Sequence, residues 1–307
     1  MKVFQVRRIL RDALSGLAIR AACIATLSSV LAVDSAGADS NEFCSDAVYD
    51  PAILAPTVKV VTLNASHGRK RAINQMLVSR KRTYQNLDDI ADLLIRIGAD
   101  IVALQEADAP SRWSGKFDHV EYLLEKTDYA CFVHGHHAQS WLYNFGSALL
   151  SDVQLVDTDS QSFAPSPPTT TKGYVSSVIN WQTTVATVPL LVVSVHLDFS
   201  RRRVRDAQVN AMIRSLSGHN MPMIVMGDMN SEWSNKESVV KLLADGLALK
   251  AYEPGEEGQG TYKSSSGKRL DWILISPQLA FIEHSVLPDV ISDHNAVYAE
   301  IGYLGVR

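Results

Sequence analysis

The chain has 307 residues, of which 46% are hydrophobic and 20% are charged. This composition is typical of a folded globular protein and excludes a disordered or collagen-like chain. The formal net charge of −4 excludes a strongly basic nucleic-acid scaffold and leaves room only for a local basic surface.

The first 38 residues have the pattern of an export signal. Five basic residues between Lys2 and Arg20 precede an apolar run over residues 21–33, and residues 36–38 (Ala-Gly-Ala) supply a small-x-small cleavage pattern. The apolar run is too short to span a bilayer, so we expect no stable membrane span. The alternatives to a cleaved signal peptide over residues 1–38 are an amphipathic first helix and an uncleaved anchor. Cleavage predicts an exported protein, either periplasmic or secreted.

Removal of residues 1–38 changes the charge and the cysteine count. Five basic and two acidic residues leave with this segment, so 24 basic and 31 acidic residues remain, a net charge of −7. Of three cysteines, Cys44 and Cys131 remain, an even number in an oxidising compartment. They form either a disulfide that ties the mature N-terminus to the core or two buried thiols.

We expect an N-terminal extension over residues 39–56 and a single domain over residues 57–307. Residues 57–64 are rich in β-branched side chains, which predicts the first strand of the domain. Apolar residues recur at helical spacing over residues 83–97, and Gly98 supplies the left-handed residue that ends many helices.

The remaining elements follow from the same periodicities, with a hairpin turn placed close to Pro189. The proline-rich segment 163–171 is too short to be a domain linker. Because strands outnumber helices and helices separate only some of them, we expect one α/β domain with two packed sheets flanked by helices. Further predicted strands cover residues 100–105, 146–151, 174–188, 190–197, 223–226, 271–275 and 295–301, and further predicted helices cover residues 119–126, 202–216 and 236–245.

Polar side chains stand at six strand ends, where they can converge on one edge of a sheet. Alternate residues of an extended chain share a face, so His196 and Asp198 point together, as do Asp228 and Asn230. Taken alone, such a residue more often forms a turn or caps a helix, and this alternative applies to Asp198 and Asn230 in particular. The complete set is Asn64, Glu106, His196 with Asp198, Asp228 with Asn230, Asp271, and Asp293 with His294.

Together with their neighbours, these residues form an ordered series of motifs. The motifs are Thr62-Leu63-Asn64, Gln105-Glu106, Gly146-Ser147-Ala148-Leu149-Leu150-Ser151, His196-Leu197-Asp198, Gly227-Asp228-Met229-Asn230, Leu270-Asp271-Trp272-Ile273 and Ser292-Asp293-His294. The series resembles the endonuclease/exonuclease/phosphatase superfamily, which includes nucleases of the DNase I type, apurinic endonucleases, sphingomyelinases and inositol-polyphosphate phosphatases. The match runs from about residue 58 to residue 301. It implies a DNase I-like, four-layered αββα sandwich of two mixed sheets, with the site at one edge.

The resemblance also implies Mg²⁺-dependent phosphoester hydrolysis. Glu106 would bind the metal, with Asn64 beside it or on the phosphate, and Asp293 would be a further metal ligand. Oxygen donors such as Glu106 and Asn64 suit Mg²⁺, or Mn²⁺, better than zinc. Asp228 would orient or deprotonate the attacking water.

Four residues are carried over as contacts to the substrate or as their supports. Asn230 would help to hold the phosphate, and His196 would donate to a phosphate oxygen or to the leaving group. His294 would contact the scissile phosphate, with its imidazole oriented by Asp271. Without the resemblance, the same set makes chemical sense, because attack on a phosphodiester anion needs a divalent cation, cationic donors and a carboxylate near the water.

Two departures from the family pattern limit the analogy. Many members have a tyrosine two residues before Gly146, where this chain has Asn144, so no role is assigned to the neighbouring Tyr143. A sphingomyelinase is expected to expose an aromatic hairpin to membranes. Trp141 and Phe145 are the only hint of one, and packing in the core is the preferred interpretation.

Histidines and basic clusters near the predicted site leave alternatives open. The run 134–137 (His-Gly-His-His) resembles a metal cluster, but without cysteine or a distant partner at zinc spacing a solvated loop is favoured. His67 either lines the pocket or belongs to a loop. Basic clusters at 69–71, 80–82 and 201–205 are usually solvated, yet the first and third follow predicted site residues and could attract a polyanion.

These observations predict an exported, Mg²⁺-dependent phosphoesterase in which water attacks phosphorus in line, most specifically a phosphodiesterase or nuclease. The expected partner is a phosphate ester, either nucleic acid, phospholipid or a small phosphorylated molecule. The alternatives are a sphingomyelinase-like enzyme, an inositol-phosphate-type phosphatase, and a non-catalytic binding module that kept the fold. Chelator-sensitive hydrolysis of a generic phosphodiester distinguishes an enzyme from a binding module. The pattern makes no prediction of oligomeric state.

Overall fold

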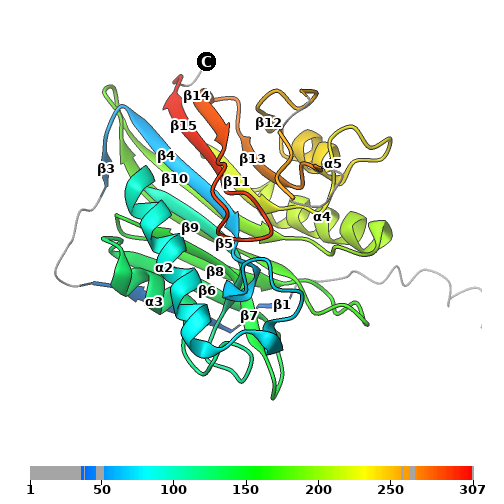
Figure 1. Ribbon diagram of the computed structural model, residues 1–307. Coiled ribbons are helices and arrows are strands. Elements are labelled where there is room, and N and C mark those ends of the chain that lie inside the picture. The colour runs from blue at the N-terminus through cyan, green and yellow to red at the C-terminus, as the bar shows by residue number, and fades with distance from the viewer. Residues whose placement is uncertain (1–35, 38, 46–51, 257–258, 263–266, 306–307) are drawn as a thin grey trace, which may run out of the picture. The chain divides into compact units, whose positions relative to one another are not determined.

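The computed structural model describes residues 36–37, 39–45, 52–256, 259–262 and 267–305 (Figure 1). The chain divides into two compact units, Met1–Asp34 and Ser35–Arg307, and all described residues belong to the second. The predicted signal peptide lies outside the described residues except for Ala36 and Gly37. Among the helices of the described part, none has the length and apolar character needed to cross a bilayer.

Two mixed β-sheets form the centre of the second unit. The strands of the first sheet are β1 (Ala36–Gly37), β3 (Ile53–Leu54), β8 (Val156–Ser162), β9 (Gly173–Gln182), β10 (Thr187–His196), β11 (Met223–Asp228), β12 (Lys250–Ala251) and β13 (Asp271–Ile275). Those of the second are β2 (Ser40–Cys44), β4 (Thr57–Asn64), β5 (Ile101–Asp108), β6 (Cys131–Gln139), β7 (Asn144–Ser151), β14 (Leu279–Val286) and β15 (Val297–Tyr303).

The strand order places the carboxyl ends of two parallel pairs close to the predicted site residues. The first sheet has the order β1-β8-β9-β10-β11-β13-β12, with β3 paired to β9, and the second has the order β14-β15-β4-β5-β7-β6-β2. Strands β10 and β11 pair in parallel, as do β4 and β5 and the short pair β3 and β9. The other pairs are antiparallel, so both sheets are mixed, as predicted.

Helices cover the outer faces of the two sheets. The α-helices of the described residues are α2 (Arg80–Ile97), α3 (His119–Lys126), α4 (Arg202–Leu216) and α5 (Val239–Gly246), and two short 3₁₀ turns, η1 (Ser66–Gly68) and η2 (Gln75–Leu77), follow β4. Helices α2 and α3 share a buried apolar core with the second sheet, and α4 and α5 share one with the first (Figure 1). The predicted αββα sandwich is therefore confirmed.

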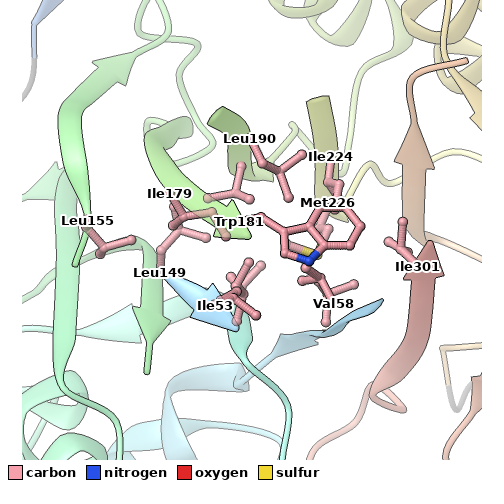
Figure 2. Close-up of a cluster of buried hydrophobic side chains, with 14 of the residues drawn as sticks. Ile53, Val58, Leu149, Leu155, Ile179, Trp181, Leu190, Ile224, Met226 and Ile301 are labelled. Carbon is pink, nitrogen blue, oxygen red and sulfur yellow. The ribbon is translucent and has the colours of Figure 1, made fainter. Parts of the chain in front are cut away.

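A third apolar core fills the space between the two sheets. Figure 2 shows side chains from both sheets gathered around the indole of Trp181. Trp181 is fully buried, and its Nε1–H donates a 2.7 Å hydrogen bond to the carbonyl oxygen of Ala55. Because the indole N–H has a partner, this large apolar ring is buried without an unsatisfied donor. The sheets are thus held face to face beneath the edge that carries the site.

Helix α2 begins earlier than its apolar periodicity predicts. The prediction starts at residue 83, whereas the helix starts at Arg80, after Ser79, whose hydroxyl accepts a hydrogen bond from the Arg82 N–H. The first turn of the helix is basic and exposed and adds nothing to the apolar pattern, so only the capping residue Ser79 indicates where the helix begins. The end is as predicted, because Gly98 adopts φ 57° and donates its N–H to the Leu94 carbonyl.

The hairpin between β9 and β10 differs from the prediction in the position of its turn. The expected strand over residues 174–188 ends at Gln182, and residues 183–186 form the turn, in which the Thr183 N–H bonds to the Ala186 carbonyl. Pro189 lies inside β10, opposite Asn180. The β-branched run across residues 183–188 conceals this turn, because its residues favour a strand.

The histidine-rich segment 134–137 is not a solvated loop. It lies within β6, where His134 is fully buried and His137 is 6% exposed. The prediction was wrong because helix α3 and the edge strand β2 cover β6. The polar residues of β6 give no sign of either contact. The sequence analysis also did not predict strands β8 and β14. Their residues are mostly polar or partly exposed, so they lack the apolar run that indicates a buried strand.

The two aromatic residues near the β6–β7 turn have different environments. Phe145 is 3% exposed and packs in the interior, as predicted. Trp141 is 77% exposed, so core packing is wrong for this residue. The guanidinium of Arg112 lies 5.5 Å from the centre of its ring, which gives the exposed indole a cation–π partner.

Cys44 and Cys131 form a disulfide, which decides between the two alternatives for this pair. The bond joins β2 to β6, and the two cysteines are directly opposite in the sheet register. Strand β2 belongs to the predicted N-terminal extension, which therefore adds an edge strand to the second sheet and is fastened there covalently.

Replacement of both cysteines by serine should destabilise the fold without altering the site. The disulfide links residues 87 positions apart, so its loss frees a long loop in the unfolded chain. We expect the free energy of unfolding in urea to fall by about 2–4 kcal/mol. Neither cysteine lines the cavity described below, so any enzymatic rate at 25 °C should be unchanged. An unfolding free energy equal to that of the oxidised wild type would contradict this role.

Candidate active site

The predicted site residues come together around one cavity of about 710 Å³. Asp271 does not line the cavity but lies directly behind His294, to which it is hydrogen-bonded. The structure thus assembles all eight residues from five strands, from the segment after β11 and from the loop before β15. The predicted residues that line the cavity are Asn64, Glu106, His196, Asp228, Asn230, Asp293 and His294.

Strand register explains why three of these residues are neighbours. His196 is paired with Asp228 across the parallel β10–β11 ladder, and Asp228 is paired with Asp271 across the antiparallel β11–β13 ladder. Paired residues on adjacent strands point to the same face of a sheet. The imidazole and the two carboxylates therefore form one row at the edge of the first sheet.

Gly227 permits the close approach of β11 to β10 just before this row. Its φ is +144°, and a Cβ atom placed on it would lie 1.9 Å from the carbonyl oxygen of Val195. No side chain fits at that distance, so only glycine keeps the ladder intact here. This backbone requirement explains the glycine that precedes Asp228 in the motif.

Glu106 reaches the cavity because the strand that carries it is irregular. The β5–β7 register shifts between Leu104 and Ala107, and Glu106 adopts φ +49°. Such a bulge redirects a side chain out of the regular alternation of a strand, and it is common next to functional sites. The carboxylate is consequently directed into the cavity rather than into the sheet.

Cations surround the Glu106 carboxylate. Its Oε2 lies 3.4 Å from His67 Nε2, and its Oε1 lies 3.7 Å from Lys172 Nζ. Burial alone would raise the pKa of Glu106, but the positive charges of His67 and Lys172 outweigh burial and hold it far below its usual range. Glu106 is therefore ionised at every physiological pH.

His67 does not line the cavity; it is a buried residue of the short turn η1 that supports Glu106. Its Nδ1 lies 2.7 Å from Asp108 Oδ1, while Nε2 faces Glu106. Burial opposes protonation of the ring, yet the charges of Asp108 and Glu106 raise its pKa above the usual 6.5. A protonated His67 donates from both nitrogens and fixes the orientation of the Glu106 carboxylate.

Asp228 is held by three neighbours at the centre of the row. Asn64 Nδ2 donates to its Oδ2 at 3.0 Å, the Asn230 N–H donates to its Oδ1 at 2.9 Å, and His196 Nε2 lies 3.5 Å from Oδ2. Burial, reinforced by the nearby charge of Asp271, raises the pKa of Asp228 to about 7. A carboxylate with this pKa is well suited to accept a proton near neutral pH.

His294 and Asp271 form a buried pair behind Asp228. His294 Nδ1 lies 2.8 Å from Asp271 Oδ2, and its Nε2 lies 3.9 Å from Asp228 Oδ2. Burial alone would lower the pKa of His294, but the charges of Asp271 and Asp228 raise it to about 10. His294 is therefore a cation at neutral pH, and its second N–H is available to an anion in the cavity.

Lys172 is a site residue that the sequence did not reveal. It is 4% exposed, and its Nζ donates a 3.3 Å hydrogen bond to His196 Nδ1. Burial and the positive charge of Lys172 lower the pKa of His196 well below 6.5, so this ring is neutral and carries its proton on Nε2. Lys172 lies directly before β9, so the rule that singled out Asp271 at the start of its strand could have found it.

Basic residues from two of the three sequence clusters reach the cavity. Arg69 lines it and forms a 2.8 Å ion pair with Asp293, and Arg205 lines it while donating to the carbonyl oxygen of Asp198. Lys268 adds a third cation to the lining. These charges create a local positive field in a chain that is acidic overall.

Asp198 has a structural role in the turn before α4, although the N-cap residue of this helix is Arg201 and not Asp198. Its Oδ1 accepts hydrogen bonds from the N–H groups of Ser200 and Arg201, at the start of α4, and its Oδ2 accepts one from the Thr169 hydroxyl. Asp198 therefore shapes the entry to the helix and ties down the proline-rich loop. Asn230 also makes a structural bond, from its amide nitrogen to the Leu197 carbonyl, but it lines the cavity as well.

The oxygen donors around the cavity fit a hard divalent cation. Glu106 is ionised and directed into the cavity, and the carboxylate of Asp293 and the amide of Asn64 also line it. Mg²⁺ and Mn²⁺ prefer such oxygen donors. Asn64 Oδ1 accepts from the Ser66 N–H, Asp293 is paired with Arg69, and the Glu106 oxygens face His67 and Lys172, so a bound ion would share each of these donors with a protein partner.

Comparison with known proteins agrees with this architecture. Residues 61–294 match the model of the Endonuclease/Exonuclease/phosphatase family. No curated protein sequence matches the chain. A solved structure of a family protein from Leptotrichia buccalis C-1013-b is similar, with 20% identity, a TM-score of 0.64, and coverage of 80% of this chain and 100% of that one.

Two further solved structures share the fold. The human Nocturnin catalytic domain with bound sulfate anion has 18% identity and a TM-score of 0.61, over 86% of this chain and 97% of that one. A mannosyl-6-phosphatase from Bacteroides thetaiotaomicron VPI-5482 has 15% identity and a TM-score of 0.61, over 80% and 100%. With a family model that covers most of its length and a matching αββα fold, the chain belongs to the endonuclease/exonuclease/phosphatase family.

Proposed function

We propose that this protein is a Mg²⁺-dependent phosphodiesterase that activates water for in-line attack on phosphorus. Family membership supports the general class, a phosphoesterase. One observation carries the specific proposal: Asp228, whose pKa is raised to about 7, and cationic His294 lie 3.9 Å apart at one cavity. A proton acceptor beside a fixed positive charge is the arrangement that hydrolysis of a phosphate ester requires.

Asp228 is the proposed general base. The hydrogen bonds from Asn64 and Asn230 fix its carboxylate, so that it can orient water and accept its proton as the bond to phosphorus forms. His294 then donates from Nε2 to a phosphate oxygen on which negative charge develops. His196 remains neutral and donates its Nε2–H to a second oxygen or to the leaving group.

Glu106, with Asn64 and Asp293, would hold the Mg²⁺ ion, and Mn²⁺ has the same donor preference. When bound, the ion neutralises phosphate charge and polarises the scissile bond. His67 and Lys172 keep Glu106 ionised and oriented, so they contribute through the ligand rather than through the substrate.

The shape and charge of the cavity favour a diester. Its volume of about 710 Å³ exceeds that of a phosphate group and leaves room for substituents beside the reacting centre. Arg69, Arg205 and Lys268 lie around it and can bind further phosphates of a polyanion. The same three cations would also suit the dianion of a phosphorylated sugar, the substrate class named for one structural neighbour, so a phosphomonoesterase is the second candidate.

A substrate panel separates these candidates. The purified protein should be assayed with Mg²⁺, and separately with EDTA, on plasmid DNA, RNA, sphingomyelin, inositol phosphates, mannose 6-phosphate and a chromogenic diester. We expect the diesters to be hydrolysed only with Mg²⁺. Release of inorganic phosphate from monoesters alone would overturn the diester assignment, and no hydrolysis of any substrate would indicate a binding module.

The pH dependence of kcat/KM should be bell-shaped. Asp228 must be unprotonated to act as base, so the rate rises as pH increases through about 7, and His294 must be protonated, so the rate falls above about 10. Asp271 raises both pKa values, so Asp271→Asn should move both limbs to lower pH, by about one to three units. A pH–rate series for the two proteins measures this, and limbs that stay in place would contradict the assignment.

We also propose that the protein is exported. The Cys44–Cys131 disulfide supports an oxidising compartment, and the sequence pattern of residues 1–38 supports a signal peptide. Mass spectrometry of the protein recovered from the producing cell should find Asp39 at the N-terminus. An intact Met1 terminus on protein that stays in the cytosol would contradict export.

A further inference from the structure

A second group of metal-ligating side chains lies outside the active-site lining. It consists of Asp118, His134 and His136, and a ligand atom of each lies within 4.8 Å of those of the other two. We propose that these three residues bind a Zn²⁺ ion. The sequence pattern showed no distant partner for the histidines, and the structure brings Asp118 to them.

Strand alternation places both histidines on the face of β6 that α3 covers. Phe132 belongs to the apolar core shared with α2 and α3, whereas Val133 belongs to the core between the sheets. His134 and His136 continue the Phe132 side, because alternate residues share a face. Asp118 is the N-cap of α3, so the helix start brings the carboxylate to the two imidazoles.

Asp118 is fixed in place by one of its oxygens. Its Oδ1 accepts hydrogen bonds from the N–H groups of Val120 and Glu121, at 2.8 and 3.0 Å. Its Oδ2 lies 3.8 Å from His134 Nδ1, which is too far for a hydrogen bond. One oxygen therefore serves the helix cap and leaves the other directed at the histidine.

His134 supplies the strongest observation. It is fully buried, and its Nε2 lies 3.1 Å from the Ala107 carbonyl oxygen, which can only accept, so Nε2 carries the proton. In the neutral ring Nδ1 is then a bare lone pair, and it has no hydrogen-bond partner. His134 Nδ1 and the Asp118 carboxylate face each other at 3.8 Å, and a cation between them would stabilise this arrangement. Histidine ligands of metals usually donate their other N–H to a carbonyl or carboxylate in this way.

His136 completes the donor set from the same strand. Its ring lies 4.9 Å from that of His134, at 89°, and its Nε2 is buried without a hydrogen-bond partner. The residue is only half-buried, which leaves a route for an ion and for a water ligand. Two imidazoles and one carboxylate suit Zn²⁺, at about 2.0–2.2 Å from each donor, whereas Mg²⁺ prefers oxygen donors alone.

Zinc uptake by matched variants tests the site. The chelator-stripped full-length protein, Asp118→Asn, His136→Gln and the exposed control His219→Gln should be dialysed against Zn²⁺ and analysed for bound metal. Asp118→Asn keeps an oxygen for the helix cap, so it should fold. We expect wild type and His219→Gln to bind one more zinc per chain than the other two variants. Glu106→Gln should retain this zinc, because Glu106 belongs to the other site.

Thermal unfolding provides a second measurement on the same proteins. At a zinc concentration about 100-fold above Kd, wild type should unfold about 5–10 °C higher than without zinc, and Asp118→Asn and His136→Gln should not respond. Mg²⁺-dependent hydrolysis by both variants should equal that of wild type. Equal zinc content and equal thermal shifts in all four proteins would overturn the proposal.

Discussion

Asp228→Asn should lower kcat by about 10³-fold while leaving the fold intact. Asparagine has nearly the same shape and can still accept the hydrogen bond from the Asn230 N–H, but it cannot accept a proton from water. Steady-state hydrolysis of a chromogenic diester at pH 8 measures the loss. A variant that retains a tenth or more of the wild-type kcat would show that another group is the base.

Thermal unfolding at pH 8 provides the control for this variant. In wild type the folded state holds the Asp228 proton more tightly than the unfolded chain, because the pKa rises from its usual 3.8 to about 7. The free energy of unfolding therefore falls as pH increases between these two values, and at pH 8 the whole contribution of this proton has been lost. Asp228→Asn avoids this loss and should unfold at the same temperature as wild type or higher. A large decrease would mean that the lost activity reflects misfolding.

His294→Ala should lower kcat by about 10²–10³-fold. The substitution removes the imidazolium whose Nε2–H faces the cavity, and with it the fixed positive charge beside Asp228. Loss of an interaction made mainly in the transition state reduces kcat and kcat/KM together, with little change in KM. The same diester assay at saturating Mg²⁺ measures both constants.

Asp271→Asn is the matched comparison for His294→Ala. It leaves the imidazole in place but removes the carboxylate that lies 2.8 Å from His294 Nδ1. We expect a smaller loss of kcat at pH 7 than in His294→Ala, together with the displaced pH limbs described above. Equal losses in both variants, with an unchanged pH profile, would indicate that the pair only maintains the local structure.

The candidate site was largely predictable from the sequence because its residues end or begin apolar strands. Asp228 and Asp271 are examples: each marks a strand end, and the register of β11 with β13 then places them side by side. The geometry around Glu106 was less predictable. The direction of its side chain depends on a bulge and on a positive φ, and no local sequence pattern indicates either.

The sequence pattern did not reveal Lys172 and left the role of His67 open, because both residues join the site through tertiary contacts. Lys172 reaches His196 only because β9 and β10 pair, and His67 reaches Glu106 only because η1 folds back onto β5. The histidines of β6 were misassigned for the same reason: helix α3 and strand β2 bury a segment whose own composition is polar. Pattern reasoning therefore found strand ends and helix faces, and it failed where burial is supplied by a distant element.

The Mg²⁺ dependence of diester hydrolysis by wild type and Glu106→Gln tests the proposed metal-dependent mechanism most directly. We predict that wild type hydrolyses a chromogenic diester with Mg²⁺, loses this activity in EDTA and regains it with excess Mg²⁺. Glu106→Gln should require at least about tenfold more Mg²⁺ for half-maximal rate, because glutamine keeps the shape of the side chain but lacks its charge. Hydrolysis that persists in EDTA would contradict Mg²⁺ dependence, and an identical Mg²⁺ requirement in the two proteins would contradict Glu106 as a ligand of the ion.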